Sequence, residues 1–200
     1  MKLLKIAPLL LLVAFLSSCT KEESIDSGSG SGSGQAGLQG TWKFISLTGK
    51  DSTVNILRDP SLELKFEIVT DISSSNPKGL YRFSGNSIKA EGVGYDYTST
   101  ITEREFENNV FQSEQIIPLS GTIAPQSGIS TYKLVGADSM YLDQNMLGGT
   151  SSAPGGLKYK LEGTKLSLFV KQTHADSVID NGVKIIEKVN TTLTVVLQKQ

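Results

Sequence analysis

The stretch that decides the fold is LKYKLEGTKLSLFV, residues 157–170. Apolar and polar side chains alternate as far as Glu162, the pattern breaks at Gly163, and the alternation then resumes toward Val170. A period of two places every second side chain on the same face of an extended strand, and a glycine between two such runs is typical of a tight turn. The stretch therefore predicts an antiparallel hairpin with one buried face.

The same period recurs from Leu38 onward, where hardly any segment has helical spacing. Residues 62–68 alternate leucine, phenylalanine and isoleucine with charged side chains. Asn181-Gly182 favours a two-residue turn and predicts a second hairpin. About eight to ten strands with short turns predict an all-β domain, a single up-and-down antiparallel barrel, with a β-sandwich as the alternative. A closed barrel would leave no exposed strand edges.

Composition excludes several classes of protein. The chain carries 19 Lys and Arg against 20 Asp and Glu, a balance that offers no attraction to nucleic acid. The single cysteine, Cys19, lies near the amino terminus, so the folded part can form no disulfide. One domain held together by a packed core is expected.

The amino terminus has the layout of a secretory signal peptide. Lys2 and Lys5 precede an apolar run from Ile6 to Leu16, which is shorter than the roughly 20 residues of a membrane-spanning helix. The residues Leu16-Ser17-Ser18-Cys19 resemble the lipobox of bacterial lipoproteins. The resemblance implies cleavage of residues 1–18, acylation of Cys19 and anchoring in a membrane.

Residues 20–37 have the composition of a flexible tether. A strict Ser-Gly alternation runs from Ser27 to Gly34, and such a composition buries nothing. Lys21-Glu22-Glu23 resembles the acidic export signal of surface lipoproteins in some Gram-negative bacteria. Two expectations stay open: an outer-membrane lipoprotein on the cell surface, or one that faces the periplasm, with the charged run only solvating the tether.

Gly40-Thr41-Trp42, at the start of the first expected strand, is similar to the Gly-x-Trp signature of lipocalins and the wider calycin group. The resemblance implies that Gly40 lets the backbone pass closely at the barrel base and that Trp42 plugs the closed end. Lys199 is the candidate for the basic residue that covers this tryptophan. The expected organisation is a signal peptide over residues 1–18, lipidated Cys19 with its tether over 19–37, and a lipocalin-like barrel over 38–200.

Aromatic residues are spread over several of the expected strands. In a lipocalin-like barrel they could line the interior around a small apolar or glycan ligand, or they could simply form the core, because about eight strands leave an interior just wide enough for side chains to fill. The candidate ligand-lining residues are Tyr81, Phe83, Tyr95, Tyr97, Phe106, Tyr132 and Tyr159.

Catalytic and cofactor motifs do not emerge from the sequence. His174 is the only histidine, so no histidine-based metal cluster or catalytic triad is expected. Glu103, Glu105 and Glu107 alternate along an expected strand, where a solvated outer face is favoured over an acid/base pair. The glycine-rich residues 148–156 predict a loop or lid rather than a phosphate site. We therefore expect that the chain is not an enzyme and that it holds no metal or cofactor.

Other short motifs complete the sequence predictions. Asp138, Asp143 and Asn145 match no calcium loop by their spacing. Ser52, Ser139 and Ser177 each follow an aspartate in a triplet that resembles a bacterial O-glycosylation acceptor. Two functions are expected to compete: a binding module for a small hydrophobic or saccharide ligand, and an accessory lipoprotein with a filled barrel that contacts another envelope protein.

Overall fold

The computed structural model of the chain describes residues 33–144, 147, 154–180 and 182–200. The signal peptide, Cys19, the acidic export signal, Asn145 and residues 148–153 of the expected loop lie outside the described residues. The elements are α1 Ser33–Leu38, β1 Gly40–Arg58, β2 Glu63–Ser84, β3 Ser87–Glu107, β4 Val110–Val135, β5 Ser139–Leu142, β6 Gly155–Glu162, β7 Lys165–Asp180 and β8 Val183–Lys199. In the described part of the chain, no helix is long and apolar enough to cross a membrane.

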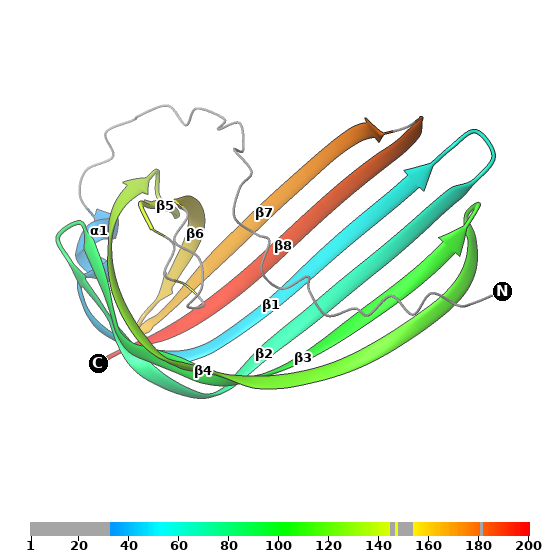
Figure 1. Cartoon of the computed structure of the whole chain (residues 1–200). Coiled ribbons are helices and arrows are strands. Elements are labelled where there is room, and N and C mark those ends of the chain that lie inside the picture. The colour runs from blue at the N-terminus through cyan, green and yellow to red at the C-terminus, as the bar shows by residue number, and fades with distance from the viewer. Residues whose placement is uncertain (1–32, 145–146, 148–153, 181) are drawn as a thin grey trace.

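The eight strands form one closed antiparallel barrel in sequence order, with β8 paired back to β1 (Figure 1). The expected up-and-down barrel is confirmed, and both predicted hairpins are present. Glu162 pairs with Lys165 around Gly163, and Asp180 pairs with Val183 around the second turn. Short turns between sequential strands dictate this topology, because each strand can only fold back beside its predecessor.

The strands differ greatly in length, and this divides the sheet into two regions. β5 has 4 residues and β6 has 8, whereas β4 has 26. Beyond the reach of β5 and β6 the other six strands continue together in the order β7-β8-β1-β2-β3-β4 (Figure 1). We call this open extension the wing. It comprises residues 48–58, 63–73, 98–107, 110–121, 170–180 and 183–194.

The wing has two free edges, which the sequence-based expectation of a fully closed barrel missed. Beyond Tyr132 the ladder between β4 and β5 ends, and beyond Phe169 the ladder between β6 and β7 ends. The barrel closes as expected where all eight strands are present, and the free edges arise because β5 and β6 are too short to continue beside the other six strands. At about 3.3 Å per residue, the six strand segments of the wing extend roughly 35 Å beyond the barrel.

The closed region is filled by its own side chains. Large residues from all parts of the barrel are at most 8% exposed and form a single hydrophobic cluster. Those that are essentially inaccessible include Trp42, Phe44, Tyr81, Ile88, Leu166, Leu168 and Leu197. Burial of so much apolar surface is the main favourable contribution to folding, since the described barrel has no disulfide.

Glycines allow the sheet to bend where the wing meets the barrel. The β2–β3 ladder shifts register between Ser75 and Leu80. Gly79 lies there with φ +92°, and a Cβ at this position would come within 2.5 Å of the carbonyl oxygen of Gly92. Only a residue without a Cβ permits this backbone conformation and this close approach.

Helix α1 closes the base of the barrel and begins within the stretch expected to be tether. Leu38 is fully buried, and a Cβ on Gly37 would lie 2.7 Å from the side chain of Leu161. Lys199 Nζ donates a hydrogen bond to Gly37 O at 3.2 Å. The last residues of α1 thus pack on the barrel base, and tertiary contacts stabilise a helix that composition alone disfavours.

Candidate functional site

The barrel base is organised around Trp42. Its Nε1 donates a hydrogen bond of 2.7 Å to Leu38 O, and the indole ring is completely buried. Lys199 pairs with Trp42 across the β1–β8 ladder, and its Nζ lies 5.2 Å from the ring centroid, within cation–π range. Gly40 precedes this cluster with φ +119°. These residues form a structural plug rather than a reactive site.

Most of the candidate ligand-lining aromatics lie in the barrel core. Phe83 and Tyr132 meet edge to face with ring centroids 5.6 Å apart. Tyr97 packs against the outer part of this core and is only partly buried. The members that are at most 8% exposed are Tyr81, Phe83, Tyr95, Tyr132 and Tyr159. These aromatics therefore pack against protein side chains.

Phe106 is the one candidate ligand-lining residue that lies far from the others. It sits near the end of β3 in the wing, with its ring centroid 5.9 Å from that of Phe111. Lys65 Nζ lies 4.0 Å above the Phe106 ring. Its position follows from the length of β3, which carries Phe106 well beyond the barrel that holds Tyr95.

The tyrosine hydroxyls of the core have different environments. Tyr132 Oη donates to Gly85 O at 2.8 Å and accepts from Gln39 Nε2 at 3.0 Å. Tyr159 Oη is buried and has no hydrogen-bond partner among the residues that the structure describes. Burial raises the pKa of the Tyr81 hydroxyl well above its usual range, with a further contribution from Tyr95. Among these hydroxyls, Tyr159 Oη is the one that could receive an external polar group.

The wing presents a second candidate surface, its inner face, which we define as the face continuous with the barrel interior. Side chains alternate between the two faces of a strand, so every second residue counted from a buried one, such as Leu47 or Val195, belongs to this face. The register aligns Leu57 with Leu64 on one side and with Ile185 on the other. Its apolar members include Leu57, Leu64, Phe66, Ile68, Ile72, Ile101, Ile117, Leu119, Val178, Val183, Ile185, Val189 and Leu193.

No second layer of described structure packs on this face. The extensive contacts between described elements are all between neighbouring strands. A sheet normally buries at least one apolar face against another layer. The inner face therefore has the character of an unoccupied interface.

The three alternating glutamates of β3 also belong to the inner face. Glu103 pairs with Ile68, Glu105 with Phe66 and Glu107 with Leu64. The expectation of a solvated outer face for them was wrong in its choice of face. The register of β2 against β3, which the sequence of β3 alone does not contain, places them beside an apolar column.

The free edges of the wing add further exposed apolar groups. On β4, Phe111 is 55% and Ile116 61% exposed; on β7, Val178 is 57% and Ile179 72% exposed. Pro118 and Pro125 interrupt the β4 edge, and proline on an edge strand hinders uncontrolled strand addition. The edges are thus partly protected against the addition of another strand, whereas no described structure covers the inner face.

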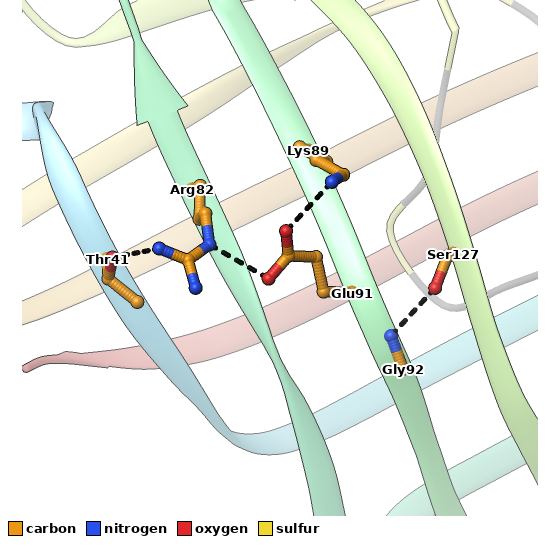
Figure 2. Close-up of polar contacts among 6 residues, drawn as sticks. All are labelled: Thr41, Arg82, Lys89, Glu91, Gly92 and Ser127. Carbon is orange, nitrogen blue, oxygen red and sulfur yellow. Dashed lines mark hydrogen bonds and ion pairs between the residues drawn. The ribbon is translucent and has the colours of Figure 1, made fainter.

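The outer wall of the barrel, in contrast, carries paired charges, and Figure 2 shows one such cluster. Glu91 bridges Arg82 at 2.8 Å and Lys89 at 3.0 Å. The hydrogen bonds from Arg82 and then Lys89 lower the pKa of the Glu91 carboxyl. This cluster has the chemistry of an ordinary solvated surface, because its charges satisfy one another.

The remaining predicted site residues are dispersed. Asp138 pairs with Lys158 at 3.0 Å, and Asp143 accepts a hydrogen bond from Thr131, so the two aspartates have separate partners. His174 lies on β7 opposite Val189. The candidate glycosylation residues lie on three strands, Ser52 on β1, Ser139 on β5 and Ser177 on β7.

Sequence reasoning missed the inner face as a site. A signal for it was present, because residues 62–72 and 95–107 each continue without Gly or Pro for longer than a small barrel needs. Comparison of the chain with protein-family models, with curated proteins and with solved structures finds no match.

Proposed function

We propose that this chain is a lipid-anchored, non-catalytic interaction protein that binds a segment of another envelope protein on the inner face of its wing. The observation that carries the proposal is the contrast between a filled barrel and an uncovered apolar sheet face. Monomeric proteins rarely expose contiguous apolar patches beyond a few hundred Å², and larger ones mark interaction sites.

The anchor part of the proposal rests on the signal peptide and the lipobox that ends at Cys19. Acyl chains on Cys19 hold the domain at the outer membrane, on the cell surface if Lys21-Glu22-Glu23 acts as an export signal and facing the periplasm if it does not. Cys19→Ala is expected to release the protein from the membrane fraction. A variant that still partitions with the membrane would contradict the lipid anchor.

The binding part can be tested with matched variants on the two faces of one strand. Phe66→Ser with Ile68→Ser changes the inner face of β2, and Val69→Ser with Ile116→Ser changes the opposite face of β2 and β4. Blue-native electrophoresis of detergent-solubilised envelopes should show wild-type protein and the outer-face variant in a high-mass complex, and the inner-face variant free.

Trp42 fluorescence provides the folding control, because Trp42 lies in the barrel and is the only tryptophan. An inner-face variant with native fluorescence that stays in the complex would refute the proposed binding surface.

A second candidate function is a lipocalin-like binding module for a small hydrophobic or saccharide ligand inside the barrel. It is favoured by the unpartnered Tyr159 Oη, since a buried hydroxyl ordinarily has a hydrogen-bond partner. Native mass spectrometry of protein from its own host would show a retained small-molecule mass, which Tyr159→Phe should reduce. Protein that leaves its host with only its own mass and its lipid would exclude this candidate.

A further inference from the structure

The two faces of the wing differ in charge. On the outer face, the acidic side chains are paired with basic ones across neighbouring strands or along one strand, and Lys171, Lys184 and Lys188 add basic groups that form no ion pair among the described residues. Lys50 lies 3.6 Å from Asp71, and Arg104 lies 2.7 Å from Glu114. Further outer-face pairs are Arg58 with Glu63 and Lys65 with Glu67.

The inner face carries carboxylates without compensating cations. Alternation and register place no lysine or arginine on it among the described residues of the wing. None of its carboxylates forms an ion pair within the described part of the chain. The acidic members are Asp51, Glu103, Glu105, Glu107, Asp176, Asp180 and Glu187.

Five of these carboxylates flank the apolar residues, and the other two, Asp51 on β1 and Glu187 on β8, lie between the flanks. Glu103, Glu105 and Glu107 follow one another along β3, while Asp176 and Asp180 lie on β7. Between these two columns lie β2 and β8, whose inner-face residues are mainly apolar, and β1, which contributes Leu57 together with small and polar residues. At about 4.8 Å per strand, the flanking columns are roughly 19 Å apart.

We propose that the inner face binds an amphipathic α-helix of a partner protein whose apolar face is bordered on both sides by lysine or arginine. This rests on the proposed function and names the chemistry of its partner. A helix with its side chains is about 10–12 Å wide, so basic side chains at both borders reach the two acidic columns while the apolar face covers β2, β1 and β8. The wing length of roughly 35 Å accommodates about 20 helical residues.

Charge complementarity selects this occupant over a lipid surface. The uncompensated carboxylates give the inner face a negative potential, which attracts basic segments and repels anionic headgroups. An apolar sheet without such charges would accept any amphipathic helix. The acidic flanks make the docking selective for basic ones and dependent on ionic strength.

The test uses three fluorescent helical peptides of about 20 residues that share one leucine-rich face and differ at its borders, which carry Lys, Gln or Glu. Their anisotropy is measured against the lipidated chain in nonionic detergent, with a detergent-only blank. The Lys peptide should bind at least tenfold more tightly than the Glu peptide, and 0.5 M salt should remove most of this preference.

Matched variants locate the effect. Glu103→Gln, Glu105→Gln and Asp176→Asn together should weaken Lys-peptide binding about tenfold. The outer-face set Glu67→Gln, Asp71→Asn and Glu114→Gln removes the same number of carboxylates and should change the binding less than twofold.

Three outcomes would overturn the inference. Equal binding of the three peptides would leave an apolar docking face but refute its selectivity. Absence of peptide binding would refute it even if Phe66→Ser with Ile68→Ser still releases the native complex, in which case the proposed function stands alone. Co-sedimentation with phosphatidylglycerol vesicles that Phe66→Ser with Ile68→Ser abolishes and Val69→Ser with Ile116→Ser does not would instead assign the inner face to a membrane surface.

Discussion

The replacement of Trp42 by alanine tests whether the barrel base is the centre of stability. The indole is fully buried, donates a 2.7 Å hydrogen bond to Leu38 O and lies beneath Lys199. Alanine removes the ring, leaves Leu38 O without its donor and removes the surface on which the Lys199 side chain rests.

The expected loss is large for a domain of this size. Truncation of a buried tryptophan to alanine costs about 3–5 kcal/mol. A buried carbonyl without a partner costs about 1–3 kcal/mol, and a cation–π contact contributes about 0.5–1 kcal/mol. Trp42→Ala should therefore lower the free energy of unfolding by about 5 kcal/mol or more. Trp42→Phe keeps most of the ring and should cost about 1–3 kcal/mol, mainly through the lost N–H donor.

The assay is urea unfolding followed by far-ultraviolet circular dichroism, since the variants remove the only tryptophan and with it the fluorescence signal. Ile116→Ala serves as control, because Ile116 is 61% exposed and should change the free energy of unfolding by less than about 0.5 kcal/mol. A loss below about 1 kcal/mol for Trp42→Ala would refute the structural role assigned to the barrel base.

Three further predictions concern the bend, the core hydroxyls and pH. Gly79→Ala should destabilise the fold by more than about 2 kcal/mol in urea unfolding, because its Cβ would meet backbone at 2.5 Å. The control Gly85→Ala, with φ +58° and open space around it, should cost only about 1 kcal/mol. Equal losses for the two variants would contradict the close approach at Gly79. Tyr159→Phe should leave the melting temperature unchanged or raise it, since the hydroxyl has no partner; a marked decrease would mean that the hydroxyl has one. Burial, and to a lesser extent Tyr95, raises the pKa of Tyr81 in the folded state. The stability that the protonated hydroxyl contributes is therefore complete below about pH 10, the ordinary tyrosine pKa, and is lost as the pH rises further. Tyr81→Phe should flatten this alkaline decline in urea midpoints between pH 8 and pH 11, and an unchanged slope would contradict the assignment.

Several properties followed from the sequence by itself. The alternation in residues 157–170 predicted the β6–β7 hairpin, and Asn181-Gly182 predicted the β7–β8 turn, because side-chain period and turn chemistry are local. The topology followed as well, since short turns leave each strand only its neighbour as a partner. Burial of Trp42 was also expected on the basis of its motif, and the nearby position of Lys199 could be named in advance.

The tertiary structure alone decided where the barrel ends and the wing begins. Residues 62–68 and the β3 glutamates alternate in the same way whether they line a closed barrel or an open sheet, so periodicity does not reveal which strands are too short to close the ring. The face on which Glu103 lies depends on its pairing with Ile68, and Phe106 is separated from the core aromatics only because β3 extends past the reach of β5 and β6. Pairing register and relative strand length are properties of several distant segments together, and for this reason the acidic, apolar inner face emerged only in three dimensions.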